Sequence, residues 1–273
     1  MAFLVKICGL KTPETLDTVI EAGADMAGFV FFPPSPRNLE YEVARRLGER
    51  AKGRVLKVAL TVDADDAAFE SIVESLRPDM LQLHGRETPA RIMELKRRFG
   101  LPVMKAIAVE EKEDLIPVAI YTRVADRILF DARPPREATR PGGLGKAFDW
   151  HLLISRWKFR KATSNRIAGW GGYDVPKQSS GNGGWGGDAE SLRHAWFSLR
   201  DALAPGTPFM LSGGLDTGNV AEALAITRAG GVDVSSGVER APGEKDSDKI
   251  RTFIKAARQA QARIENVKVA SNA

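Results

Sequence analysis

The sequence predicts an α/β protein, a single (β/α)₈ (TIM) barrel with a Gly/Ser-rich insertion between strands six and seven. Eight short runs of apolar and β-branched residues alternate with helix-like segments, as in such a barrel. The strand starts, taken at residues 4, 28, 57, 80, 103, 127, 208 and 232, are separated by 24, 29, 23, 23, 24, 81 and 24 residues. An open doubly wound sheet would also alternate in this way, but the count of eight favours the barrel.

Strands and helices can be placed along most of the chain. The strand candidates are Phe3–Ile7, Ala27–Phe32, Leu56–Val62, Met80–Leu83, Val103–Val109, Arg127–Phe130, Pro208–Leu211 and Val232–Val234. Helical spacing of apolar residues predicts helices over Pro13–Ala22, Asp65–Arg77, Pro89–Phe99, Thr217–Arg228 and Ser247–Ile264. Several of these segments start near Pro, Asp or Ser, which are favoured at helix N-termini.

Length and composition fit one globular domain. At about 150 residues per domain, 273 residues would suggest nearly two domains, but α/β barrels reach about 250 residues as one domain. We therefore expect residues 1–273 to form one barrel domain. A content of 43% hydrophobic and 27% charged residues excludes disorder throughout. No apolar run approaches the roughly 20 residues of a membrane helix, so we expect no membrane partner.

The insertion, at about residues 158–205, accounts for the interval of 81 residues. The stretch Gly169–Gly187 is rich in Gly and Ser, and such segments bury too little surface to order themselves. The apolar spacing in Asp188–Leu203 predicts an amphipathic helix that packs back on the barrel. We expect a solvent-exposed excursion without a role. The alternative is that its basic run, with Trp157 and Phe159, binds a polyanion or a partner subunit.

Charge and cysteine content bear on partners and location. The chain has 40 basic and 35 acidic residues, and the five bases between Arg156 and Arg166 equal the whole excess of +5. Five charges are too few to predict a nucleic-acid partner. The single cysteine and the lack of a signal-peptide pattern in residues 1–10 predict a reducing, cytoplasmic compartment. We expect a monomer or a homodimer.

Polar residues at the carboxyl ends of barrel strands are candidates for the active site. Side chains alternate along a strand, so residues two apart face the same way. Four pairs could face the barrel axis near its top: Lys6 and Cys8, Gln82 and His84, Leu129 and Asp131, and Asp233 and Ser235.

Cys8 and Asp131 are candidate proton-transfer groups. A lone cysteine is usually a small buried hydrophobe, but Lys6 on the same strand face would favour the thiolate, which acts as a base or nucleophile. A carboxyl group at Asp131, at a strand end, would be partly desolvated and suited to general acid catalysis. The alternative is a turn aspartate before Pro134–Pro135. An acid and a base across one barrel mouth suit proton transfer at a sugar carbon.

Three glycine-bearing stretches predict a phosphate site. They are Gly142–Gly145, Ser212–Gly214 and Ser235–Gly237, and the last two follow strands seven and eight. Backbone N–H groups in such loops, with a helix N-terminus beyond, bind phosphate in these barrels. One Gly-Gly pair would be only a turn signal, but the set indicates phosphate. The candidate contacts are Gly145, Gly213, Gly214, Ser235, Ser236 and Gly237.

The loop Pro33–Arg37, after strand two, contains three prolines and is predicted to be stiff. It would hold Arg37 over the mouth. A guanidinium there could bind a carboxylate through two parallel hydrogen bonds. The alternative is a solvated loop arginine.

Together these motifs resemble the phosphoribosylanthranilate isomerases of tryptophan biosynthesis. The likeness covers residues 3–154 and 207–258, in order and at the expected spacing. The motifs are Lys6-Ile7-Cys8-Gly9-Leu10, Gly23-Ala24-Asp25, Gly28-Phe29-Val30-Phe31, Ser35-Pro36-Arg37, Gln82-Leu83-His84-Gly85, Leu129-Phe130-Asp131, Phe148-Asp149-Trp150, Leu211-Ser212-Gly213-Gly214-Leu215 and Asp233-Val234-Ser235-Ser236-Gly237-Val238-Glu239.

The resemblance implies a (β/α)₈ barrel that acts on a phosphorylated sugar amine. The reaction is the Amadori rearrangement of N-(5′-phosphoribosyl)anthranilate to 1-(2-carboxyphenylamino)-1-deoxyribulose 5-phosphate, which needs no cofactor and no metal. By the family pattern, Cys8 is the general base and Asp131 the general acid. Arg37 faces the anthranilate carboxylate, and Asp233 lies beside the amino and hydroxyl groups of the substrate.

The sequence departs from the family in two places and leaves alternatives open. Leu144 stands where the family has Ser, Thr or Asn, and the insertion replaces a connection of a dozen or so residues. The related histidine-pathway sugar isomerases use two aspartates, so Cys8 argues against them. A catalytically silent barrel whose insertion binds a partner is the third alternative. The roles of Lys6, Gln82, His84 and Lys105 stay open, with His84 expected to be hydrogen-bonded rather than catalytic.

Overall fold

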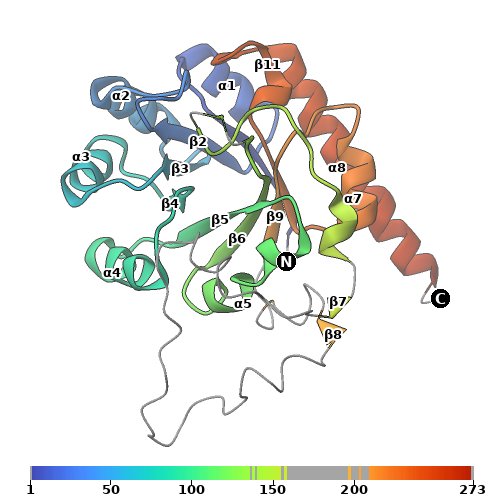
Figure 1. Cartoon of the computed structure of the whole chain (residues 1–273). Coiled ribbons are helices and arrows are strands. Elements are labelled where there is room, and N and C mark those ends of the chain that lie inside the picture. Colours follow the sequence, from blue (N-terminus) through green and yellow to red (C-terminus); the bar gives the residue numbers. More distant parts are fainter. Residues whose placement is uncertain are drawn as a thin grey trace, which may run out of the picture.

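A closed barrel of eight parallel strands forms the centre of the molecule (Figure 1). The computed structural model describes residues 2–135, 137–138, 140–154, 157–158, 196–197, 203 and 209–271. The barrel strands are β1 (Leu4–Cys8), β2 (Met26–Phe31), β3 (Leu56–Thr61), β4 (Met80–Leu83), β5 (Val103–Val109), β6 (Arg127–Ala132), β9 (Phe209–Leu211) and β10 (Gly231–Val234). They follow the order β1-β10-β9-β6-β5-β4-β3-β2. The predicted barrel is confirmed.

Helices surround the barrel (Figure 1). They are α1 (Pro13–Glu21), α2 (Tyr41–Ala51), α3 (Asp66–Leu76), α4 (Pro89–Phe99), α5 (Val118–Tyr121), α7 (Val220–Thr227) and α8 (Ser247–Ser271), with the 3₁₀ turns η1 (Lys112–Leu115), η2 (Trp150–Leu153) and η5 (Ser236–Val238). The five predicted helices are all present, although α8 continues beyond Ile264. None of the described helices is long and apolar enough to cross a membrane.

Helix α2 was not predicted, because five of its 11 residues are charged and no side-chain cap marks its start. Its buried residues are Ala44, Leu47, Gly48 and Ala51, and only Leu47 among them is a large apolar side chain. The charged residues lie on the opposite, exposed face and make the segment polar on average. The neighbouring strands β2 and β3 pair in parallel, and this geometry requires a crossover connection between them.

Side-chain caps explain where three helices begin. Thr12 caps α1 by accepting from Thr15 N–H at 3.3 Å, Asp65 caps α3 by accepting from Ala68 N–H at 2.8 Å, and Thr88 caps α4 in the same manner. These side chains satisfy amide donors that have no partner within the helix. Helices α1 and α4 also start with proline, whose fixed φ suits the first helical position.

The barrel interior is apolar toward the amino ends of the strands and polar toward their carboxyl ends. The apolar cluster inside it consists of Met26, Val58, Met104, Ala106, Leu129 and Met210. The buried polar side chains Lys6, Gln82 and Asp233 share the inward-facing parity of their strands, as predicted. A much larger apolar core fills the space between strands and helices. The core therefore closes one end of the barrel and leaves the other for chemistry.

The structure corrects one prediction about the insertion. Trp196–Phe197, inside the helix expected at Asp188–Leu203, form strand β8, which pairs antiparallel with β7 (Trp157–Lys158). Aromatic residues favour paired strands, and the pairing with β7 overrides the helical spacing at these positions. Except for Leu203, the rest of that expected helix, the stretch Gly169–Gly187 and the basic run beyond Lys158 lie outside the described residues.

The contact between α2 and α3 gives a stability prediction at Gly48. A Cβ at this position would lie 2.5 Å from the carbonyl oxygen of Leu76. Alanine normally stabilises a helix by about 0.5–1 kcal/mol relative to glycine. Here we expect Gly48→Ala to lower the free energy of unfolding by about 1–3 kcal/mol, because overpacking outweighs helix propensity.

Urea denaturation measures this difference. The matched control is Arg46→Ala, at an exposed position of the same helix, and it should change stability by less than about 0.5 kcal/mol. A Gly48→Ala variant as stable as the wild type would contradict the close helix packing.

Candidate active site

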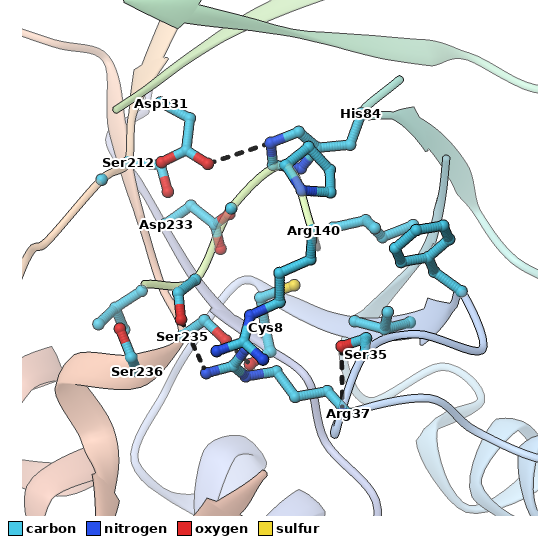
Figure 2. Close-up of a pocket in the computed structure, with 18 of the residues that line it drawn as sticks. Cys8, Ser35, Arg37, His84, Asp131, Arg140, Ser212, Asp233, Ser235 and Ser236 are labelled. Atoms are coloured by element: carbon cyan, nitrogen blue, oxygen red, sulfur yellow. Dashed lines mark hydrogen bonds and ion pairs between the residues drawn. The ribbon is translucent and has the colours of Figure 1, made fainter. Parts of the chain in front are cut away.

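A pocket opens at the carboxyl ends of the barrel strands (Figure 2). Together with the open solvent at its mouth, it spans about 630 Å³. Val30, Leu60 and Val62 give part of the wall an apolar surface, and the polar lining includes Cys8 and Asp131. These two side chains come from β1 and β6, which are not neighbours in the barrel. The structure therefore brings both predicted proton-transfer residues to one cavity.

The predicted substrate-binding residues gather at the same mouth. The lining also includes Arg37, Asp233, Gly213, Gly214, Ser235 and Ser236. A Cβ at Gly145 would lie 3.7 Å from Ser236 Oγ, so Gly145 flanks that loop. Gly237 packs against the carbonyl oxygen of Leu215, where a side chain would collide. Leu144 is exposed and leaves the loop backbone unobstructed.

Cys8 lies beside a buried ammonium group. Lys6 Nζ donates to Asp233 Oδ1 at 3.0 Å, and the Lys6 side chain has no solvent exposure. Gly28 on the neighbouring strand makes this crowding possible, because a Cβ there would lie 2.8 Å from Cys8 Sγ and 3.0 Å from Lys6 Nζ. The sulfur, the ammonium and the carboxylate therefore form a compact inward-facing cluster.

The cluster sets the protonation behaviour of Cys8. Burial raises the pKa of the Cys8 thiol above its usual 9.0, and the charge of Lys6 acts in the opposite direction. Burial also opposes the charged form of Lys6, but the carboxylate of Asp233 and the thiolate outweigh it, so the pKa of Lys6 is raised. Lys6 thus stays protonated and favours the thiolate, which is the form needed in a base.

Asp131 is held by groups on both of its oxygens. Its Oδ1 accepts from the backbone N–H of Ala132 at 2.9 Å. Its Oδ2 lies 3.0 Å from His84 Nε2, and Figure 2 shows the imidazole pointing at the carboxylate. Gln82, buried inside the barrel, is 3.4 Å from the other ring nitrogen of His84. His84 is therefore hydrogen-bonded to Gln82, in line with the sequence-based expectation, and its Nε2 lies within ion-pair distance of Asp131.

Lys105 faces away from the barrel axis and supports the loop that carries His84. It pairs with Glu87 at 2.9 Å and donates to the carbonyl oxygen of Gly85 at 2.7 Å. Glu87 also accepts from the backbone N–H groups of Asp63 and Gly85. A buried ion pair with these extra hydrogen bonds fixes the loop after β4.

Arg37 is buried and already bound to a carboxylate of the protein. Its Nε and Nη2 donate to the two oxygens of Glu239, each at 2.7 Å, and Nη2 also donates to the carbonyl oxygen of Gly143 at 3.2 Å. Glu239 begins β11 (Glu239–Ala241), which forms a hairpin with β12 (Glu244–Lys245). The expected position over the mouth is therefore present, together with a carboxylate partner that was not expected.

Lys245 completes this network from the second strand of the hairpin. Its Nζ donates to Glu239 at 2.8 Å and to the carbonyl oxygen of Ser235 at 2.8 Å. Burial lowers the pKa of Lys245 from 10.5 to about 8, although Glu239 acts to raise it. Burial opposes ionisation of Glu239 as well, but Arg37 and Lys245 outweigh it and lower its pKa. These charges anchor the Arg37 loop to the loop after β10.

Sequence reasoning missed three residues near the site. Glu239 is inside a recognised motif but had no assigned role, and neither Lys245 nor Arg140, which lines the pocket, was considered. The contacts of Glu239 and Lys245 depend on the hairpin geometry, for which the sequence gives only a Pro-Gly turn signal at residues 242–243. Among the described residues, no group of three or more His, Cys, Asp or Glu side chains is arranged to bind a metal ion.

Comparison with known proteins decides the family. Residues 5–170 and 180–256 match the model of the N-(5′-phosphoribosyl)anthranilate (PRA) isomerase family. The chain belongs to this family. It is 59% identical to N-(5′-phosphoribosyl)anthranilate isomerase of Bradyrhizobium sp. strain BTAi1, with coverage of 96% of this chain and 98% of the relative. The same-named protein of Nitrobacter hamburgensis is 53% identical, with 96% and 95% covered.

Solved structures of PRA isomerases share the fold. The Thermotoga maritima enzyme has a TM-score of 0.70 and 30% identity, with 95% of this chain and all of the other chain covered. A PRA isomerase in complex with reduced 1-(o-carboxyphenylamino)-1-deoxyribulose 5-phosphate has a TM-score of 0.67 and 28% identity, with the same coverage.

Alkylation of Cys8 tests the role of Lys6, because Cys8 is the only cysteine. In the wild type, we expect the rate of modification by iodoacetamide to rise with pH around a midpoint above 9.0, since the thiol pKa is raised. Lys6→Met should move this midpoint further upward, because the thiolate loses its neighbouring ammonium.

Two further variants serve as controls. Removing one partner of a buried ion pair costs about 3–5 kcal/mol, so Lys6→Met/Asp233→Asn, which leaves no unpaired carboxylate, is measured in parallel. Its midpoint should also lie above that of the wild type. Lys105→Met breaks a buried pair outside the barrel and should leave the midpoint unchanged. An unchanged midpoint in the Lys6 variants would rule out the proposed electrostatic role.

The low pKa of Lys245 predicts how stability depends on pH. Between about pH 8 and 10.5 the unfolded chain retains a proton that folded Lys245 has lost, so this group makes the free energy of unfolding rise with pH. Urea denaturation at several pH values would compare Cys8→Ser with Cys8→Ser/Lys245→Met, a background in which no thiol titrates. The stability of the first relative to the second should increase across this window. A constant or falling difference would show that Lys245 is not titrating there.

Proposed function

We propose that the protein is a phosphoribosylanthranilate isomerase of tryptophan biosynthesis. It converts N-(5′-phosphoribosyl)anthranilate to 1-(2-carboxyphenylamino)-1-deoxyribulose 5-phosphate. The observation that carries this proposal is that Cys8 and Asp131 line one pocket together with the glycine and serine loops after β9 and β10. These side chains and loops suit the reaction, because an aldose-to-ketose rearrangement is catalysed by one acid and one base. The phosphate group of this substrate also needs a binding site.

Proton transfer begins at Asp131. This residue protonates the furanose oxygen, so the ring opens to an iminium ion. The thiolate of Cys8 then removes the C2′ proton, which the adjacent iminium makes acidic, and an enolamine results. The enolamine becomes the ketose when C1′ takes a proton from solvent and the 2′-hydroxyl group releases one. A proton then passes from the Cys8 thiol to Asp131 through solvent, which restores both groups, so no net proton is consumed. Each transfer contributes about 10²- to 10⁴-fold to the rate.

Binding groups position the substrate for these transfers. We assign the phosphate to the backbone N–H groups of the loops that contain Gly145, Gly213, Gly214, Ser235, Ser236 and Gly237. Arg37 faces the anthranilate carboxylate through Nη1, which its contacts with Glu239 leave clear. Asp233, held by Lys6, lies beside the amino and hydroxyl groups of the substrate. Fixing both ends of the substrate aligns C2′ with the sulfur.

The organisation of the whole chain is also a proposal. We infer one domain over residues 1–273, with an insertion at about 158–205 and no membrane or nucleic-acid partner. A monomer or homodimer is consistent with the Thermotoga maritima relative, which is described as dimeric. A cytoplasmic location is supported by a lone cysteine placed in the pocket, where a reduced thiol is needed.

A fluorescence assay that follows loss of the anthranilate amine tests the function. Wild-type protein should turn the substrate over, and Cys8→Ser and Asp131→Asn should each lower kcat by about 10²- to 10⁴-fold. Asp126→Asn is a matched control, since Asp126 precedes β6 at the opposite end of the barrel and pairs with Lys96. Near-normal turnover in either site variant, with folding verified by circular dichroism, would remove that residue from the mechanism.

A further inference from the structure

The charged groups around the pocket are almost all paired within the protein. Lys6 is bound to Asp233 at 3.0 Å, and His84 Nε2 lies 3.0 Å from Asp131. Arg37 binds both oxygens of Glu239, which also binds Lys245 (2.8 Å). The substrate of the proposed reaction carries a phosphate at one end and a carboxylate at the other. Because of these internal pairs, little positive charge in the pocket is left to bind the two anionic groups of the substrate.

Arg140 is the exception among the described residues that line the pocket. It lies between β6 and η2, just before the glycines of the predicted phosphate loop. Figure 2 shows its side chain extending into the pocket, which Arg37 also lines. Its Nε is buried and has no hydrogen-bond partner within the described part of the chain. A buried donor without an acceptor is costly, so this group is prepared for a ligand.

The geometry of Arg37 shows why a second arginine is needed. Arg37 uses Nε and Nη2 on Glu239, and Nη2 also donates to Gly143. Only Nη1 is left for the substrate, so Arg37 cannot offer a carboxylate two parallel N–H donors from its Nε edge. Arg140 can supply such a fork, and an anion bound by both arginines of the pocket would offset their mutual repulsion.

We propose that Arg140 binds the anthranilate carboxylate of the substrate together with Arg37. This inference rests on the proposed function and deepens it. The carboxylate is favoured over the phosphate because Arg140 lines the same pocket as Arg37, whereas backbone donors of the loops after β9 and β10 are available for the phosphate. Arg140 moves no proton. It is a binding residue that holds the anthranilate end of the substrate.

A cycle of two proteins and two ligands tests this assignment. The proteins are the wild type and Arg140→Gln. The ligands are reduced 1-(2-carboxyphenylamino)-1-deoxyribulose 5-phosphate and the same compound with phenyl in place of carboxyphenyl. Arg140→Gln should weaken binding of the carboxylated ligand by about 10- to 100-fold, the range of a hydrogen bond to a charged group. It should change affinity for the phenyl ligand less than twofold.

Other variants separate charge from geometry. Arg140→Lys should recover part of the lost affinity, because an ammonium keeps the charge but cannot form two parallel hydrogen bonds. Arg240→Gln removes the same charge at an exposed position of the β11–β12 hairpin and should leave both affinities unchanged. With substrate, Arg140→Gln should raise KM more than it lowers kcat, since a binding interaction is lost.

The outcomes are distinct. Equal weakening of both ligands would place Arg140 on the phosphate and overturn the carboxylate assignment, and unchanged affinities would overturn any binding role. Failure of the isomerase proposal gives a different result, which is absence of turnover in the wild type. The carboxylate-dependent difference between the two ligands is measured without turnover, so it tests Arg140 in either case.

Discussion

The ion pair between Lys6 and Asp233 is the interaction on which the rest of the site depends. It joins β1 to β10, the first and last strands of the barrel, whose pairing closes the sheet. Both side chains are buried, so loss of either would leave a charge without a partner, at a cost of about 3–5 kcal/mol. The pair therefore fixes the register in which the chain closes.

Strand alternation extends this register to the pocket. Cys8 and Ser235 lie two residues beyond Lys6 and Asp233 and face the same way, and Ser235 Oγ donates to the carbonyl oxygen of Cys8 at 3.1 Å. The proposed general base and one of the proposed phosphate loops are thus positioned by the same pair of strands. A slip of one residue at closure would turn both away from the pocket.

The loops around the mouth are held by buried charge in a similar way. Glu87 and Lys105 fix the loop that presents His84 to Asp131, and Glu239 with Lys245 fixes the loop that presents Arg37. Each network consists of charged side chains, and burial without a partner would disfavour their ionised forms. Their mutual pairing ties the loops of the mouth together and leaves few ionic groups unpaired among the described residues, with Arg140 as the exception in the pocket.

The sequence by itself determined the features that depend on local pattern. The repeat of strand and helix predicted eight barrel strands, and alternation predicted that Lys6, Cys8, Asp131 and Asp233 face inward, because both follow from backbone periodicity. It did not lead us to helix α2, which is rich in charged residues, or to the strand at Trp196–Phe197. Tertiary structure alone decided that Arg37 binds Glu239, 202 residues away, and that Arg140 lines the pocket with no partner for its Nε among the described residues. Such contacts arise only when barrel closure brings distant loops together, and local periodicity carries no information about them.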